Sequence, residues 1–428
     1  MPLVPKKYLT HILLIVLFSA SFLLPIQNHA LAVSNQPQVQ GQAVILMDFH
    51  SGRILYAKNI NQNMPPASVT KIMTALLVTE NGDLDQVVEI SPYAASTRES
   101  GLYLQAGEKM TRRQLLYACM LPSANDASVA LAESVSGQEE DFVELMNQRA
   151  AELGLEDTHF CNPHGLHESD HYTTAYDLAC LSRVAMQDPT FREIVSTSNI
   201  VIPGPPKEED RSIWNQNRLL YRYDRAVGIK TGFTHQAGNC VVGAAQKNGM
   251  LLIAVSLNSP SVYQDLMNML DYGFSNYHLV ELEPSKETLL VKVKGGIENK
   301  LSLEPEQQLL IAAMDGEESE LSCEFLPVAE VRAPVNQGDV LGLATIYLEN
   351  QEIASIKLVA ASSVEARVSG LMSIASGIAG IYKWALFILL LYWIGKRQKS
   401  QEVLKTILRP IVLSIMKRRT TRNNSLRQ

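Results

Sequence analysis

Residues 65–71 read Pro-Pro-Ala-Ser-Val-Thr-Lys, and an apolar run with helical spacing follows from Val69 to Glu80. The two prolines end any preceding helix, so the periodic run starts a new helix here. Ser68 therefore lies at a helix N-terminus, where free backbone N–H groups and the helix dipole favour developing negative charge. Lys71 lies one helical turn further on, so its amine can reach the Ser68 hydroxyl. This segment predicts a serine nucleophile paired with a lysine.

The reactivity of Ser68 depends on the protonation state of Lys71. Serine is a poor nucleophile without a base, and lysine is a base only when burial or a neighbouring cation lowers its pKa. We expect Lys230 to be that neighbouring cation. The alternative is that Ser68 is an ordinary helix N-cap, which would be favoured if no further motif accompanied it.

A second motif, Ser123-Ala124-Asn125, follows an apolar helix and a proline and precedes another helix. We expect it on a loop that carries polar side chains into a cleft. Ser123 could relay a proton to a departing amine, and Asn125 could hydrogen-bond Lys71 or a substrate amide. Taken alone, the same pattern is typical of a helix cap, and Asp126 could equally serve as one.

A third motif, Lys230-Thr231-Gly232, lies between an apolar stretch and Gly238, which predicts a strand at a sheet edge. A cation beside a hydroxyl recognises a carboxylate, and Gly232 allows a substrate backbone to approach closely. The backbone N–H groups of Ser68 and Phe233 are the predicted oxyanion hole.

Each motif is common by itself, and two of them recur in this chain, at residues 414–417 and 256–258. Only the first copies stand in the order nucleophile, middle loop, Lys-Thr-Gly, each in a suitable local context. The ordered set predicts a serine acyl-transfer enzyme.

Residues 33–282 alternate strand and helix patterns and form the predicted catalytic domain. An antiparallel sheet carrying helices is expected, an α/β or α+β fold with a helical subdomain. Its expected strands are Gln42–Asp48, Arg53–Ala57, Cys240–Gln246 and Leu251–Leu257, the last two joined by an Asn248-Gly249 turn. Its expected helices are Val69–Glu80, Arg112–Met120, Ala127–Val135 and Asp141–Leu153.

Residues 283–366 show short strand patterns without a helical period, which predicts a small β-sandwich. The expected strands are Thr288–Val293, Gln308–Ala312, Glu330–Arg332, Val340–Tyr347 and Ile353–Ala360. This domain offers no plausible catalytic group, so we expect it to be a spacer that holds the catalytic domain away from a membrane.

The two ends of the chain predict export and anchoring. Residues 1–32 have a basic start, an apolar core and the cleavage pattern Ala30-Leu31-Ala32, as a signal peptide does. Residues 367–395 contain the apolar run Leu371–Ile394, interrupted by Lys383, which either spans the bilayer or lies in its interface. Residues 396–428 hold ten Lys or Arg and one acid, so we expect a cytoplasmic tail, either solvated or lying on the anionic inner leaflet. The enzyme is therefore expected on the outer face of the cytoplasmic membrane.

Charge and cysteine content exclude other classes. The chain carries −7, of which the tail contributes +9 and the signal peptide +2, so residues 33–395 carry −18. A domain this acidic is not a nucleic-acid binder. The five cysteines form no C-x-x-C pair and no disulfide framework, so we expect them to be small apolar residues: Cys119, Cys161, Cys180, Cys240 and Cys323.

From about Gln42 to Ala366, the chain resembles the D-alanyl-D-alanine carboxypeptidases of the low-molecular-mass penicillin-binding proteins, peptidase family S11. Besides the three motifs, the resemblance rests on segments 101–107, 160–166, 171–177, 228–232, 333–335 and 358–361. It implies a serine transpeptidase/β-lactamase-like fold that removes the terminal D-alanine from peptidoglycan stem pentapeptides. The reaction runs through an acyl-serine opened by water, β-lactams trap the same serine, and no metal or cofactor takes part. Many members are also anchored to the membrane at the C-terminus.

One departure from the family concerns the substrate carboxylate. Many members bind it with an arginine in the stretch after the closing strands, but residues 258–265 contain none. Either Lys230 and Thr231 suffice, or one of three other arginines substitutes: Arg218, Arg222 or Arg225.

Two other functions remain as alternatives. A β-lactamase is disfavoured because Glu144, in a motif resembling its deacylating glutamate, lies on the polar face of an amphipathic helix. A membrane-tethered penicillin-binding sensor is disfavoured by the intact catalytic motifs. The histidines at 159, 164, 167 and 171 fit no helical metal-binding spacing.

Overall fold

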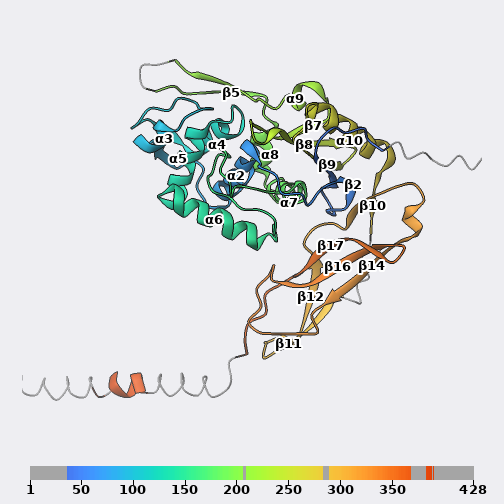
Figure 1. Cartoon of the computed structure of the whole chain (residues 1–428). Coiled ribbons are helices and arrows are strands. Elements are labelled where there is room, and N and C mark those ends of the chain that lie inside the picture. Colours follow the sequence, from blue (N-terminus) through green and yellow to red (C-terminus); the bar gives the residue numbers. More distant parts are fainter. Residues whose placement is uncertain (1–35, 206–208, 283–288, 368–381, 388, 390–428) are drawn as a thin grey trace, which may run out of the picture. The chain divides into compact units, whose positions relative to one another are not determined.

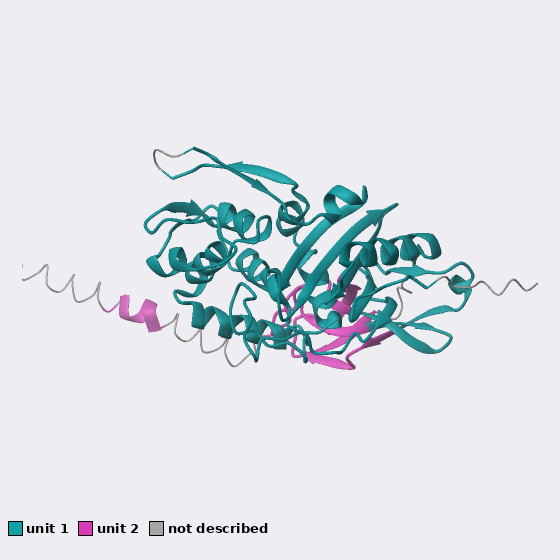
Figure 2. Ribbon diagram, turned by 45° about the horizontal axis from the view of Figure 1, so that its top comes forward, with its two compact units in different colours: residues 1–284, 307–324, 344–356 teal, residues 285–306, 325–343, 357–428 magenta. Residues whose placement is uncertain are grey.

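The computed structural model describes residues 36–205, 209–282, 289–367, 382–387 and 389 (Figure 1). The chain divides into two compact units, the first made of residues 1–284, 307–324 and 344–356 and the second of residues 285–306, 325–343 and 357–428 (Figure 2). The predicted signal peptide, the tail and most of the anchor segment lie outside the described residues. Within the described part of the chain, no helix has the length and apolar character needed to cross a membrane.

The first unit is built on a five-stranded antiparallel sheet with the order β2-β1-β9-β8-β7. The β8–β9 hairpin turns at the predicted Asn248-Gly249 pair, because Lys247 pairs with Met250 and both turn residues have positive φ, 51° and 85°. Strand β7 is an edge strand, so one of its sides is free to face a ligand. The strands are β1 Ala43–Asp48, β2 Ile54–Lys58, β7 Ala226–Thr234, β8 Gly238–Lys247 and β9 Met250–Leu257.

Helices cover both faces of this sheet, which explains why all six residues of β1 are buried. Ile45 and Met47 point into a core shared with the large helical layer, while Val44 and Leu46 point into a second core with α10. The predicted antiparallel sheet with a helical subdomain is therefore confirmed. The helices are η2 Ala67–Thr70, α2 Lys71–Glu80, α3 Pro92–Ser96, α4 Arg112–Met120, α5 Asn125–Ser136, α6 Glu139–Glu152, α7 Ala175–Ala185, α8 Pro189–Ser196, α9 Leu219–Arg222 and α10 Val262–Asn276.

Helix α2 is a core helix, with eight of its ten residues buried. It packs against α4, α5 and α7, so its first residue, Lys71, is enclosed by other elements. A helix that is apolar nearly all round can be buried on all sides in this way. The fold therefore places a lysine in the interior, where its charge is costly.

Three two-stranded sheets complete the first unit. They are β3 (Val87–Glu89) with β4 (Lys109–Thr111), β5 (Asn199–Ile202) with β6 (Arg211–Trp214), and β10 (His278–Glu281) with β13 (Leu310–Ala313). The last pair differs from the sequence prediction. The strand expected at Gln308–Ala312 exists as β13, but it pairs with β10 instead of joining the C-terminal sheet.

The predicted C-terminal β region is confirmed, and its strands form a six-stranded sheet with the order β14-β16-β17-β12-β11-β15. Strands β11 and β12 alternate exposed and buried residues, as expected when one face of a sheet packs on a core. The sequence prediction missed β12 and β14, and the sandwich arrangement stays a prediction. The strands are β11 Leu290–Lys294, β12 Lys300–Pro305, β14 Leu321–Pro327, β15 Glu330–Arg332, β16 Val340–Leu348 and β17 Gln351–Ala360.

Candidate active site

Ser68 lies in the short 3-10 helix η2, which leads directly into α2. The Nζ of Lys71 lies 3.1 Å from the Oγ of Ser68, so the predicted contact between these two side chains is present. Ala67 enters the turn with a φ of 51°, a value that L-residues rarely adopt. Ser68 itself is half-buried and lines a cleft, so its hydroxyl is open to a substrate.

Lys71 is fully buried and is held by two further oxygen atoms. Its Nζ donates to Asn125 Oδ1 at 2.8 Å and to the backbone carbonyl of His164 at 2.7 Å. Burial lowers the pKa of Lys71 to about 8. Of the two causes that we considered, burial accounts for the lowered pKa of Lys71, because the protein interior disfavours the charged ammonium, and Lys230 is not among the causes.

The Lys230 amine, on the edge strand β7, is also buried and lies next to the second motif. Its Nζ donates to Ser123 Oγ at 2.9 Å and to the carbonyl of Thr231 at 2.9 Å. Burial, followed by the positive charge of Lys71, lowers the pKa of Lys230 to about 7. The positive charge of Lys71 therefore adds to the effect of burial on Lys230.

The second motif lies on a loop between helices, as predicted. Ser123 has a φ of 67°, and α5 begins two residues later, at Asn125. Asp126, which we considered a helix cap, instead accepts hydrogen bonds from the backbone N–H groups of Leu102 and Leu104, both at 3.0 Å. Asp126 thereby fixes the loop that carries Ser100, a residue lining the cleft.

Strand β7 passes close to the nucleophile. A Cβ placed on Gly232 would lie 2.7 Å from the backbone nitrogen of Ser68, so only glycine fits here. The following residue, Phe233, lines the cleft that also contains Ser68.

This cleft has a volume of about 540 Å³ and brings together most of the predicted site residues. Its lining residues include Ser68, Ser100, Ser123, Asn215, Gln216, Arg218, Thr231, Gly232, Phe233, Asn239 and Tyr263.

The segment 160–171 contributes a part of the site that sequence reasoning missed. Its Gly165 has a φ of 88°, and a Cβ there would lie 1.9 Å from the carbonyl oxygen of Ala67. His171 Nε2 lies 2.9 Å from Thr70 Oγ1, next to the nucleophile. Burial lowers the pKa of His164 to about 3 and that of His171 to about 4, so both are neutral. These buried histidines pack the loop beside η2, and the atom of this loop that contacts Lys71 is the carbonyl oxygen of His164.

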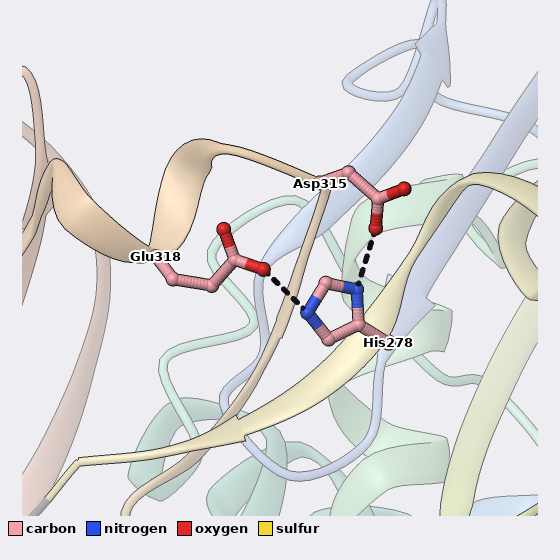
Figure 3. Close-up of side chains that lie close together, drawn as sticks. All are labelled: His278, Asp315 and Glu318. Carbon is pink, nitrogen blue, oxygen red and sulfur yellow. Dashed lines mark ion pairs between the residues drawn. The ribbon is translucent and has the colours of Figure 1, made fainter.

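Two further expectations concern acidic and metal-binding groups. Glu144 is exposed on α6, as expected for a solvated residue. Among the described residues, one group of three potential metal ligands lies close together, outside the cleft: His278, Asp315 and Glu318 (Figure 3). The two ring nitrogens of His278 lie 3.4 Å from Asp315 and 2.9 Å from Glu318, so ion pairing already accounts for this exposed cluster.

The chain matches two family models. Residues 30–261 match the family described as D-alanyl-D-alanine carboxypeptidase, and residues 279–366 match the C-terminal domain of penicillin-binding protein 5. The first match contains all three motifs of the cleft, and the second coincides with the β region that follows it.

Individual relatives agree with these matches. The D-alanyl-D-alanine carboxypeptidase DacF of Bacillus subtilis is 34% identical over 327 residues, which cover 74% of this chain and 83% of the relative. The D-alanyl-D-alanine carboxypeptidase DacA of Haemophilus influenzae is 32% identical over 340 residues, which cover 75% of this chain and 84% of the relative. The crystal structure of penicillin-binding protein 5 from Haemophilus influenzae shares 30% identity and a TM-score of 0.61, covering 77% of this chain and 98% of that one.

Proposed function

This chain belongs to the D-alanyl-D-alanine carboxypeptidase family of serine peptidases, and from that membership we propose how its cleft removes a terminal D-alanine. Ser68 is the nucleophile, Lys71 the base that activates it, and Ser123 the hydroxyl that delivers a proton to the leaving amine. The substrate is a peptidoglycan stem pentapeptide ending in D-Ala-D-Ala, and β-lactams acylate the same serine.

The observation that carries this proposal is the set of three contacts around Lys71 Nζ. Two of them, Asn125 Oδ1 and the His164 carbonyl, can only accept hydrogen bonds. A neutral amine has two N–H donors, which these two oxygens occupy, so its lone pair is left for the Ser68 hydroxyl at 3.1 Å. The site therefore orients Lys71 as an acceptor of the Ser68 proton.

Acylation then proceeds in balanced steps. Neutral Lys71 takes the proton of Ser68 as Oγ bonds to the carbonyl carbon of the penultimate D-alanine. The tetrahedral oxyanion is stabilised by the backbone N–H groups of Ser68 and Phe233, a role supported by the close approach of Gly232 to Ser68. The C–N bond breaks when the leaving nitrogen takes a proton from Ser123, which Lys230 replaces across their 2.9 Å contact.

Deacylation uses the same groups. One proton has been taken from Ser68 and one given to the leaving amine, so the two lysines together hold as many protons as at the start. One lysine is therefore neutral and can accept a proton from the water that attacks the acyl-serine. Hydrolysis restores Ser68 and releases the shortened stem peptide. Asn125, Lys230, Thr231 and Gly232 bind the substrate beside these reacting atoms.

We place the enzyme on the outer face of the cytoplasmic membrane. The A-x-A pattern at residues 30–32, the apolar run 371–394 and the basic segment 396–428 support export, a C-terminal anchor and a cytoplasmic tail. The β domain at residues 283–366 serves as a spacer between membrane and cleft.

The direct test is release of free D-alanine by the full-length protein from a pentapeptide ending in D-Ala-D-Ala, with Ser68→Ala beside it. Wild-type release should exceed that of the variant by at least about 10⁴-fold, because the nucleophile is lost. Covalent penicillin labelling should disappear in the variant as well. No D-alanine release with stable labelling of Ser68 would favour the sensor, and rapid penicillin hydrolysis without D-alanine release would favour the β-lactamase.

A further inference from the structure

We propose that Arg218 binds the C-terminal carboxylate of the substrate, in a role that rests on the proposed function. Arg218 lines the cleft together with Ser68 and Thr231. It comes from the loop that precedes α9, whereas the stretch after β9 contains no cation. The carboxylate-binding group of this enzyme thus enters the cleft from the loop before α9, and not from the stretch after the closing strands.

The cleft needs a permanent positive charge that Lys230 does not supply. The Lys230 amine already donates to Ser123 Oγ and to the Thr231 carbonyl. In the proposed reaction, Lys230 also passes its proton to Ser123, so it does not keep its charge throughout the reaction. An arginine remains protonated at any pH the enzyme meets and offers two parallel donors to a carboxylate. Arg218 is the arginine among the residues that line this cleft.

The backbone holds Arg218 in place for this task. Its N–H lies 3.3 Å from the hydroxyl of Tyr263, and Tyr263, in the first turn of α10, lines the same cleft. On the other side, the buried Asn217 accepts a hydrogen bond from the N–H of Leu219 at 3.1 Å through its Oδ1. These contacts fix the loop, while the Arg218 side chain stays exposed. Within the part of the chain that the structure describes, the guanidinium forms no ion pair with a carboxylate, so it is free to bind one from a substrate.

The other two arginines are engaged elsewhere. The guanidinium of Arg222 lies over the Tyr263 ring at 5.4 Å, and that of Arg225 lies over the Tyr223 ring at 5.9 Å. Neither residue lines the cleft that contains Ser68. Of the three arginines that the sequence left as alternatives, the geometry points to Arg218.

The experiment compares two acyl-D-alanyl thioesters that differ only in the leaving thiol. One thiol, thioglycolate, carries a carboxylate, and the other, thioglycolamide, carries a neutral amide in its place. The full-length protein in detergent hydrolyses both, and thiol release gives kcat/KM for each. In the wild type, the carboxylate thioester should be preferred. In Arg218→Gln, its kcat/KM should fall on the order of ten- to a hundredfold, as expected for the loss of a charged hydrogen-bonded pair.

Controls separate this role from misfolding and from failure of the proposed function. The amide thioester should react equally well with wild type and Arg218→Gln, Arg218→Lys should regain part of the preference, and Arg222→Gln should behave as wild type. An unchanged acid-to-amide ratio in Arg218→Gln would overturn the assignment, as would an equal fall for both thioesters. A wild type that hydrolyses neither thioester and releases no D-alanine would instead refute the proposed function.

Discussion

Lys230 Nζ lies 2.9 Å from Ser123 Oγ, a contact that joins the edge strand β7 to a loop 107 residues earlier in the chain. In the mechanism that we propose, this contact makes Lys230 the source of the proton that Ser123 delivers to the leaving amine. Lys71 makes the corresponding contact with Ser68, so each reactive hydroxyl has its own buried amine. Burial is the main cause that lowers the pKa of both amines.

The first prediction concerns pH. Only neutral Lys71 can take the Ser68 proton, and burial lowers its pKa to about 8. The second-order rate constant for acylation by a fluorescent penicillin should therefore rise about tenfold per pH unit below this pKa and level off above it. Stopped-flow measurements from pH 6 to 9.5 test this. A profile that is flat across this range would remove Lys71 as the base.

The second prediction separates Lys230 from Arg218. Lys230 is hydrogen-bonded to Ser123, which protonates the leaving nitrogen in the proposed mechanism. Lys230→Ala should therefore slow cleavage of peptides with either a charged leaving group, D-alanine, or a neutral one, D-alaninamide, by roughly a hundredfold. Arg218→Gln should affect only the peptide with the charged leaving group. Kinetics of both variants on these two peptides decide this. A loss confined to the peptide ending in a free carboxylate in Lys230→Ala would show that Lys230 acts mainly in carboxylate recognition, as its position in the Lys-Thr-Gly motif first suggested.

The third prediction tests the loop beneath the nucleophile. Gly165→Ala would place a Cβ 1.9 Å from the Ala67 carbonyl, so the loop must move and take the His164 carbonyl away from Lys71. We expect acylation to slow at least tenfold and stability to fall by several kcal/mol. Gly154→Ala is the matched control. Its glycine also has positive φ, 71°, but a Cβ there meets nothing within 4 Å.

Gly154→Ala should therefore lose only about 1–2 kcal/mol of stability, the cost of the backbone conformation, and keep wild-type acylation. Thermal unfolding and penicillin acylation of both variants provide the measurements. Equal acylation rates in the two variants would mean that the loop does not position Lys71.

Much of the catalytic domain could be predicted because its helices and strands carry clear periods. The predicted helix Arg112–Met120 has these bounds in the structure, and the Asn248-Gly249 hairpin has the predicted turn. Helix α10 was missed, and its Gly273 illustrates the reason. Glycine usually disfavours a helix interior, but here a Cβ would lie 2.5 Å from Leu252, so the residue permits close packing of α10 on the sheet.

The site was predictable where its chemistry lies in side chains with a fixed spacing, as for Ser68 and Lys71. The His164 carbonyl was not, because a backbone oxygen has no signature in the sequence. The choice of Arg218 over Arg222 also depended on the fold. All three arginines lie within a few residues of one another, and only the loop before α9 decides which of them lines the cleft.

The last prediction concerns the anchor. If residues 367–428 attach the enzyme to the membrane, deleting them should move the protein from the membrane fraction to the soluble fraction. D-Alanine release per molecule should stay unchanged, because the residues that line the cleft lie between 68 and 263. Removing residues 396–428 alone separates the basic tail from the apolar run, and this shorter deletion should leave the protein membrane-bound. Fractionation with penicillin labelling reads out both variants. A 367–428 deletion that stays in the membrane fraction, with its signal peptide cleaved, would place the attachment elsewhere in the chain.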